Sequence, residues 1–428
     1  AALLISDIVG RGGGPVEESQ GSEKAPIRRG GFNVFPLDLR REERGAYLRS
    51  LDVSEEGVGI LERRMDALCL QAEGVDARAA SILKQDMLSA GGDVALPQTV
   101  SRFVQGPVKL LLMGTLREYR HLCQGLTAQP YGLKGLGAEI QECLRRMARP
   151  RRLAARGRDL LEGRTHLIVG IVNVTPDSFY GGGRHLNAAG AVSHGQRLAE
   201  EGADVLDVGA ESTRPGSDPV SEEEERNRLL PVIGGLRSSL PDLPISVDTT
   251  KAAVARAALD AGADLVNDIS AGAFDGGTIP LCAERKVPLV LMHLRGVPKT
   301  MQAEPSYEDV LAEVVSELRE RVAAAEAAGL GPGQIVVDPG FGFGKKPEHN
   351  LALLAHLEAL SCRGHPILGG ASRKSTSGAL TGAPAEERLP GTIALHTAAL
   401  LRGAQILRVH DVNEHRQALA CAAALLNP

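Results

Sequence analysis

Polar side chains follow each of eight apolar runs in the part of the chain that begins at residue 165. They carry carboxylate, amide, hydroxyl and cationic groups, at Asn173, Asp177, Asp207, Thr213, Arg214, Asp248, Asn267, Asp338, Lys374, Ser375, Arg408 and His410. A single polar residue at a strand end is often only a helix cap. Parallel α/β folds, however, place their chemistry at the carboxyl ends of strands. The repetition over eight runs therefore predicts one shared site.

The residue types indicate the ligand. We expect Asp248, Asn267 and Asp338 to converge at the centre, where carboxylates and amides pair with the N–H, amino and carbonyl groups of a planar heterocycle. Cationic residues follow other strands, at Arg214, Arg373, Lys374, Arg408 and His410. With the Thr213 hydroxyl and the helix start at Ser375, they suit a phosphorylated substrate. For any single arginine, a surface salt bridge is an equally good interpretation.

Strand and helix patterns alternate from residue 165 onward. Strands are predicted at 166–173, 203–209, 243–248, 264–267, 288–293, 334–338, 365–370 and 404–409. Helices are predicted at 188–201, 222–239, 250–261, 276–285, 308–328, 348–361, 386–402 and 412–426. Eight βα repeats over about 260 residues favour a closed (β/α)₈ TIM barrel over an open sheet.

The chain divides into four segments, 1–30, 31–150, 151–164 and 165–428. The first is rich in Gly, Pro, Glu and Arg and is predicted to be disordered or loosely attached. The second resembles a small α/β domain of unknown role, the third a linker, and the fourth the barrel. Within the second segment, Asp76 and Gly91 bound an amphipathic helix, residues 108–115 fit a buried strand, and 58–73 fit either a strand or a helix.

Composition narrows the class of protein. The 428 residues contain 48 Lys+Arg and 53 Asp+Glu, so no basic excess indicates a nucleic-acid partner. No apolar run reaches the roughly 18 residues of a membrane helix, and the first residues lack the basic start of a signal peptide. The six cysteines have no metal-site spacing and are expected to be free thiols. We therefore expect a cytoplasmic protein with no membrane partner.

Eight motifs of the barrel segment resemble those of dihydropteroate synthases. In chain order they are NVTPDSF, DVGAESTRPGS, SVDTTK, NDISAG, LMHLRGVPKTMQ, DPGFGFGK, SRKS and LRVHD. The resemblance covers residues 165–428 and implies a TIM-barrel transferase of folate biosynthesis. Such an enzyme condenses 6-hydroxymethyl-7,8-dihydropterin diphosphate with p-aminobenzoate and releases diphosphate. The resemblance also implies Mg²⁺, a homodimer and a site that sulfonamides occupy.

The same resemblance implies a role for individual residues. The pterin pocket would comprise Asp248, Asn267, Asp338, Phe343 and Lys374. The diphosphate site would comprise Asn173, Thr213, Arg214, Arg408 and His410. Mg²⁺ would bind at Asn173. The p-aminobenzoate site would comprise Phe179, Thr213, Pro215 and Ser375. The catalytic residues would be Asp177, Asp207, Arg214, Lys374 and Arg408. The loops 174–186 and 210–220 would close over the substrate.

The implied reaction needs no covalent enzyme intermediate. Mg²⁺ and the cationic residues would stabilise the departing diphosphate. The pterin can carry a developing positive charge at its methylene carbon, and Asp177 would offset that charge. The neutral aniline nitrogen then attacks, while the closed loops keep water away.

Two stretches depart from the family pattern. Tyr180, Gly181 and Gly182 replace the usual residues of the first loop, and Thr376-Ser377 stand where Phe-Ile is common. The second departure bears on sulfonamide affinity more than on catalysis.

Two other functions are compatible with the sequence. A pterin-binding methyltransferase that passes a folate methyl group to a corrinoid protein would share the barrel and the pterin pocket. It would not need the diphosphate residues. A barrel acting only as a non-catalytic scaffold would not need intact Asn173, Arg214, Lys374, Arg408 and His410, so their presence argues against it.

Overall fold

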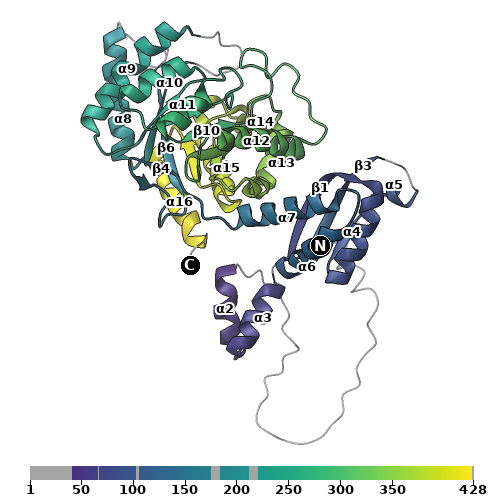
Figure 1. Ribbon diagram of the computed structural model, residues 1–428. Helices are drawn as coiled ribbons and strands as arrows, with labels where there is room; N and C mark the ends of the chain where they lie inside the picture. The colour runs from purple at the N-terminus through teal and green to yellow at the C-terminus, as the bar shows by residue number, and fades with distance from the viewer. Residues whose placement is uncertain (1–40, 66, 103–105, 175–183, 212–219, 427–428) are drawn as a thin grey trace, which may run out of the picture.

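The computed structural model describes residues 41–65, 67–102, 106–174, 184–211 and 220–426 (Figure 1). Eight parallel strands form the larger unit: β6 (Leu167–Asn173), β7 (Val205–Gly209), β8 (Ile245–Asp248), β9 (Leu265–Asp268), β10 (Leu289–Met292), β11 (Ile335–Asp338), β12 (Leu368–Gly369) and β13 (Ile406–Val409). They follow the order β11-β10-β9-β8-β7-β6-β13-β12. A parallel bridge between Val337 and Ile367 joins the two ends of this order. The predicted (β/α)₈ barrel is confirmed.

Helices surround the strands (Figure 1). They are α8 (Arg184–Glu200), α9 (Glu222–Ser239), α10 (Ala252–Asp260), α11 (Thr278–Arg285), α12 (Val310–Ala327), α13 (Pro347–Ala355), α14 (Ser375–Thr381), α15 (Leu389–Leu401) and α16 (Val412–Leu426). The predicted helix 348–361 differs in detail, because after α13 the chain tightens into the 3₁₀ helix η3 (Leu357–Arg363). The predicted helix 386–402 likewise begins with the 3₁₀ helix η4 (Ala385–Glu387). None of the described helices is long and apolar enough to cross a membrane.

The side chains that face the barrel axis form two layers. The lower layer is apolar, with Leu167, Val169, Val205, Leu265, Val290, Val336, Leu368 and Ile406 in one cluster. Side chains alternate between the two faces of a strand, so the next inward position lies two residues further along. On four strands that position is polar, at Asp207, Asn267, Asp338 and Arg408. The lower end of the barrel is therefore filled by apolar side chains, and the upper end is lined by polar and charged ones.

The segment 151–164 closes the lower end of the barrel. It forms a short hairpin of β4 (Ala154–Ala155) and β5 (Arg158–Asp159). Leu153, Leu160 and Leu161 are buried and belong to the same cluster as the lower layer. This segment therefore packs as part of the barrel core.

A smaller α/β unit precedes the barrel. Its antiparallel sheet has the order β1-β3-β2, with β1 (Ala67–Asp76), β2 (Asp93–Ala95) and β3 (Pro107–Thr115). Its helices are α2 (Arg41–Ser50), α3 (Glu55–Arg64), α4 (Ala77–Ala90), α5 (Gln98–Ser101), α6 (Leu116–Gly125) and α7 (Leu133–Met147). As predicted, the Asp76 side chain caps α4 and Gly91 ends it in the left-handed conformation. The ambiguous segment 58–73 divides between α3 and β1.

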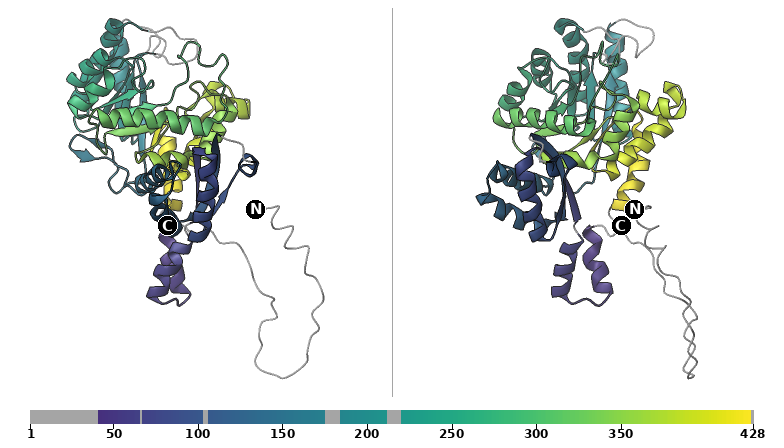
Figure 2. Two further views of the ribbon diagram at one scale, coloured as in Figure 1. Left: turned by 45° about the vertical axis from the view of Figure 1, so that its right-hand side comes forward. Right: turned by 90° about the vertical axis from the view of Figure 1, so that its right-hand side faces the viewer.

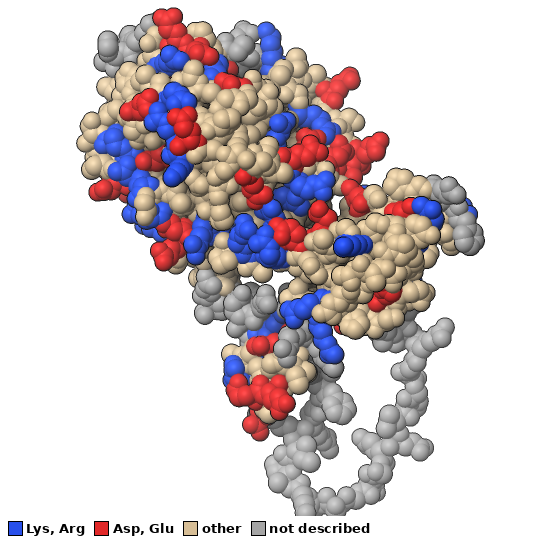
Figure 3. Space-filling view, in the orientation of Figure 1, with Lys and Arg blue, Asp and Glu red and all other residues tan. Residues whose placement is uncertain are grey.

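Helix α7 joins the small unit to the barrel (Figure 1). Arg146 of α7 pairs with Glu326 of α12 at 2.9 Å and donates to the Arg363 carbonyl at 3.1 Å. In both views of Figure 2 the α2–α3 pair projects away from the barrel. Figure 3 shows basic and acidic side chains interspersed over the face in view. Residues 1–40, including the start of the predicted small domain, lie outside the described part.

Candidate functional site

Arg408 of β13 is at the centre of an ionic network in the upper layer. Its Nε donates to Asp207 Oδ2 at 2.6 Å and its Nη2 donates to Asp248 Oδ2 at 2.7 Å. The Asn267 amide also donates to Asp207 Oδ2, at 3.0 Å. Strands β7, β8 and β9 are neighbours, and Arg408 reaches them from β13 on the other side of β6, although the four residues lie as much as 201 positions apart in the sequence. Within the described part of the chain, Asp207 Oδ1 has no hydrogen-bond partner.

Gly209 leaves space for this network because it has no side chain. Gly209 pairs in register with Asp248, and a Cβ at Gly209 would lie 3.2 Å from the Asp248 Cβ. That distance is tighter than most carbon–carbon contacts, so a larger residue would displace the carboxylate. The glycine of the DVGAES motif therefore lets Asp248 face the barrel axis.

Burial sets the electrostatics of the network. It raises the pKa of Asp248 to about 7, although the Arg408 cation opposes the shift. Burial also disfavours the charge of Arg408, but Asp207 and Asp248 more than offset this and its pKa is raised. Arg408 therefore keeps its charge, whereas Asp248 can change protonation state near neutral pH. Asp248 could therefore exchange a proton with a bound ligand.

Lys374 and Asp338 form a second pair beside the network. A side chain at Gly370 would come within 3.8 Å of Lys374 Nζ and 3.9 Å of Asp338 Oδ2, so both groups border the space that this glycine leaves open. Burial lowers the pKa of Lys374 to about 8, while Asp338 acts in the opposite direction. Burial raises the pKa of Asp338, against the effect of Lys374. This pair presents an acceptor and a donor to the same open space.

The loop after β11 positions Lys374. The Lys374 ammonium donates to the Phe341 carbonyl at 2.6 Å and lies 4.4 Å from the centre of the Phe343 ring. The loop is held tight at Gly340 and Gly344, which have φ of +68° and +62°. A Cβ there would meet the carbonyl oxygens of His293 and Arg295, at 2.0 and 2.3 Å. Both positions therefore need glycine.

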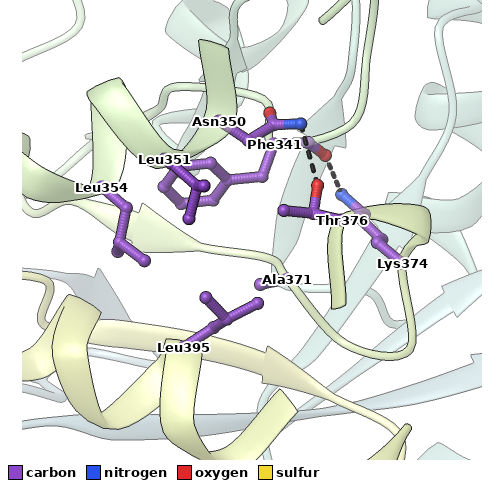
Figure 4. A pocket seen from close by; sticks show the side chains of 8 residues that line it. All are labelled: Phe341, Asn350, Leu351, Leu354, Ala371, Lys374, Thr376 and Leu395. Atoms are coloured by element: carbon purple, nitrogen blue, oxygen red, sulfur yellow. Dashed lines mark hydrogen bonds between the residues drawn. The ribbon is translucent and has the colours of Figure 1, made fainter. Parts of the chain in front are cut away.

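Asn350 and Lys345 form hydrogen bonds with this loop, and neither residue was predicted to have a functional role. The Asn350 amide accepts from the Gly342 N–H at 2.9 Å and donates to the Thr376 hydroxyl at 2.9 Å, which links the loop to α14. Figure 4 shows the Asn350–Thr376 and Lys374–Phe341 hydrogen bonds beside a small apolar pocket. The buried Lys345 ammonium donates to the carbonyls of Gly340 and Phe343. Lys345 ends the GFGFGK motif, which could have drawn attention to it. Asn350 lies in an ordinary helical pattern, so the sequence does not single it out.

Residues that follow β12 and β13 contact one another at the carboxyl end of the barrel. Ser372 Oγ lies 2.9 Å from His410 Nδ1. Arg373, which the sequence placed among the ligand-binding cations, instead pairs with Asp411 through its Nε at 3.0 Å. The salt-bridge interpretation therefore describes Arg373. Below them, buried His396 accepts from the Ala371 N–H at 2.9 Å and fixes the backbone before Lys374.

The remaining predicted residues divide into two groups. Asn173 ends β6 at an inward position, Phe343 is buried against Ile269, Met292 and Met301, and Ser375 opens α14 with an exposed side chain. Five predicted residues lie outside the described residues: Asp177, Phe179, Thr213, Arg214 and Pro215. The structure thus brings together the residues predicted to bind the planar heterocycle, whereas most of the two predicted closing loops lies outside the described residues.

No dedicated metal cage is present among the described residues, where no group of three His, Cys, Asp or Glu side chains could hold an ion. Mg²⁺ bound mainly through substrate phosphates needs only one or two protein oxygens. The amide oxygen of Asn173 is such a hard donor, so the residues fit an ion that arrives with a phosphorylated ligand.

Comparisons with known proteins identify the family to which this barrel is similar. A family model described as pterin binding enzyme matches residues 169–410. The dihydropteroate synthase of Neisseria meningitidis serogroup B is 47% identical over 264 residues, which cover 60% of this chain and 92% of that protein. The solved dihydropteroate synthase of Xanthomonas albilineans with 4-aminobenzoic acid is 48% identical, with a TM-score of 0.60, and the match covers 65% of this chain and 98% of that one.

A longer relative also includes part of the N-terminal unit. A probable bifunctional folylpolyglutamate synthase/dihydropteroate synthase of Haloferax volcanii is 39% identical over 369 residues, or 83% of this chain. The chain spans only 43% of that relative's length. Since the family model matches residues 169–410, which carry the polar layer, and the shorter relative is covered over 92% of its length, the chain belongs to the family of pterin-binding enzymes that contains the dihydropteroate synthases.

Proposed function

We propose that the protein is a dihydropteroate synthase, which joins 6-hydroxymethyl-7,8-dihydropterin diphosphate to p-aminobenzoate and releases diphosphate. The observation that carries this proposal is the polar layer at the carboxyl ends of the strands, with Asp207, Asp248, Asn267, Asp338 and Arg408 above an apolar layer. Proteins named as dihydropteroate synthases match 60% and 65% of this chain.

The Asp338–Lys374 pair would recognise the pterin ring. Asp338 Oδ1 accepts from the Gly340 N–H at 2.7 Å, which leaves Oδ2 toward the open space beside Gly370. A carboxylate oxygen accepts from a ring N–H and an adjacent amino group, and an ammonium donates to a ring carbonyl. A 2-amino-4-oxo ring carries these groups along one edge. Asp248 and Asn267 would contact the opposite edge, with Phe343 packed close by.

Cations at the rim would bind the diphosphate. Arg408 keeps its charge between two carboxylates, and His410 lies at the end of the same strand. Thr213 and Arg214 would contribute from the loop after β7. Asn173 would hold Mg²⁺, which would supply positive charge to the leaving diphosphate oxygens. These assignments derive from residue types, strand positions and the family resemblance.

The bond changes require only positioned groups. The bond between the methylene carbon and the diphosphate oxygen breaks, and a new bond forms from that carbon to the aniline nitrogen, which then loses a proton. Arg214, Arg408 and Lys374 would offset the charge of the departing group, and Asp177 and Asp207 would offset the positive charge that develops on the pterin. Phe179, Thr213, Pro215 and Ser375 would hold p-aminobenzoate in line for this attack.

We also propose a cytoplasmic homodimer, on the strength of the family resemblance alone. Light scattering on the purified chain tests the dimer, which predicts twice the monomer mass of 45.1 kDa.

A product assay tests the proposed activity directly. The protein is incubated with the pterin diphosphate and Mg²⁺, with and without p-aminobenzoate, and diphosphate and dihydropteroate are measured. We expect diphosphate release that depends on p-aminobenzoate and matches dihydropteroate formation. Failure to release diphosphate, together with tight binding of a methylated folate, would instead support the methyltransferase. If neither occurs, the scaffold interpretation gains support.

A further inference from the structure

Two cysteines meet where the N-terminal unit packs on the barrel. Cys143 lies in α7 and Cys362 lies in η3. Contacts from α7 and the residues after it bracket Cys362: Arg151 donates to the Ser361 carbonyl at 3.1 Å, and Arg146 donates to the Arg363 carbonyl at 3.1 Å. Cys143 precedes Arg146 by three positions, so both face the same side of the helix. The Cys143 thiol donates to Met147 Sδ at 3.9 Å, and the two cysteines lie close enough that each shifts the pKa of the other.

A guanidinium lies against one of the two sulfurs. Arg363 donates to Cys362 Sγ from Nε at 3.1 Å and from Nη2 at 3.0 Å. Two charge-assisted donors on one sulfur favour the thiolate, which is the reactive form of cysteine. The environment agrees, because hydrogen bonds and the Arg363 charge lower the pKa of Cys362, whereas its neighbour raises the pKa of Cys143. One thiol is therefore prepared for attack and the other remains protonated beside it.

We propose that Cys362 and Cys143 form a peroxide-reactive thiol pair whose oxidation links the N-terminal unit to the barrel by a disulfide. Both thiols are partly exposed, so a small peroxide can reach the pair. The other partly or fully exposed cysteines, Cys69 and Cys421, have no guanidinium on sulfur among the described contacts. The pair is thus distinguished by its charge and its partner, and not by exposure.

The reaction proceeds in two balanced steps. The Cys362 thiolate attacks one peroxide oxygen, forming an S–O bond as the O–O bond breaks and hydroxide leaves. The Cys143 sulfur then attacks the resulting sulfenic acid, forming the S–S bond as the S–O bond breaks. The sulfenic hydroxyl leaves as water with the Cys143 proton. The two sulfurs lose two electrons, and the peroxide gains them.

The thiol pair is separate from the candidate ligand site. The segment η3 precedes β12, so it lies at the amino end of that strand, whereas the polar layer lies at the carboxyl ends. This inference does not depend on the proposed synthase activity. The cross-link would restrain α7 on the barrel and leave the ligand residues untouched.

Peptide mapping of the full-length protein tests the pair. The reduced protein is labelled with limiting iodoacetamide at about pH 6.5, where ordinary thiols react slowly, and each cysteine's rate is read by mass spectrometry. We expect Cys362 to react at least about fivefold faster than the more exposed Cys69 and Cys421. Hydrogen peroxide should then give a Cys143–Cys362 linked peptide that dithiothreitol removes.

Three variants separate the roles of the residues. Cys143→Ser should yield a Cys362 sulfenic acid that dimedone traps, and Arg363→Gln should slow labelling of Cys362. Arg402→Gln is the matched control, because Arg402 is an exposed arginine that pairs with Glu358 of the same 3₁₀ helix. Cys362 labelling no faster than that of Cys69 and Cys421, or oxidation that yields no linked peptide, would overturn the proposal in the wild-type protein without any variant.

Discussion

The two layers of side chains inside the barrel are built on the same strands and differ by two residues. Val205, Leu265, Val336 and Ile406 give way to Asp207, Asn267, Asp338 and Arg408 at the next inward position. The lower layer is sealed by the segment 151–164, while the upper layer opens at the ends of the strands. The same backbone geometry thus stabilises the fold below and presents charge above.

This contrast assigns different consequences to neighbouring positions. In the lower layer a smaller side chain leaves a cavity and costs stability. In the upper layer a change alters charge pairing and, with it, ligand recognition. The distinction is sharpest on strands β7, β9, β11 and β13, where one residue of each kind faces the same axis.

Arg408→Met should have the largest effect. It leaves Asp207 and Asp248 without their shared cation, and removing one partner of a buried ion pair costs about 3–5 kcal/mol. Synthase activity should fall by about 1,000-fold or more because the charge opposite the leaving group is lost. Chemical denaturation and the product assay measure the two effects. Activity within tenfold of wild type would contradict the role given to the upper layer.

Leu265→Ala tests the lower layer two residues below Asn267. The buried side chain should cost about 2–5 kcal/mol of unfolding free energy when truncated. Below the melting temperature, kcat/KM per folded molecule should match wild type. If this variant lost activity while retaining its stability, the separation between the layers would fail.

The pH dependence of pterin binding tests Lys374. Its pKa is lowered to about 8, so the folded protein loses this proton as pH rises through that value, well below the ordinary lysine range. Affinity for a 2-amino-4-oxo pterin should then fall about tenfold per pH unit above the pKa. Titration calorimetry between about pH 8 and 9.5, above the pKa of about 7 of Asp248, measures this decline. Lys374→Arg should flatten the profile, and an unchanged profile would exclude the lysine as its source.

Lys109→Ala should have the smallest effect and tests a contact outside both layers. Lys109 of β3 pairs with Asp309 at 2.6 Å across the two units, but both side chains are substantially exposed. An exposed pair contributes about 0–1 kcal/mol, so stability and activity should remain close to wild type. A large loss of activity would show that the N-terminal unit acts on the barrel through this contact.

The sequence predicted the barrel because each strand combines an apolar run with a polar end. It also predicted that Asp248, Asn267 and Asp338 converge, since parallel strands bring their carboxyl ends together. It did not identify the packing of Leu153, Leu160 and Leu161 beneath the barrel. Their spacing matches neither a helix nor a strand, and their partners come from distant strands.

The orientation of single side chains was harder to predict. Arg373 has a positive φ of 55° and pairs with Asp411, although its place in SRKS suggested a ligand contact. Asn350 links the loop after β11 to α14, but its position in α13 gives no local sign of this. Hydrogen bonds between residues distant in sequence depend on the folded backbone, so their partners cannot be inferred from spacing alone.

Pterin binding by two variants of β11 tests the central claim most directly. Asp338→Asn changes the upper layer, and Val336→Ala changes the lower layer of the same strand. We predict that titration calorimetry with a 2-amino-4-oxo pterin shows a loss of about 100-fold or more for Asp338→Asn, because the variant loses a charge-assisted pair of hydrogen bonds. Val336→Ala should bind like wild type. Equal affinities for both variants and wild type would contradict the assignment of pterin recognition to the upper layer.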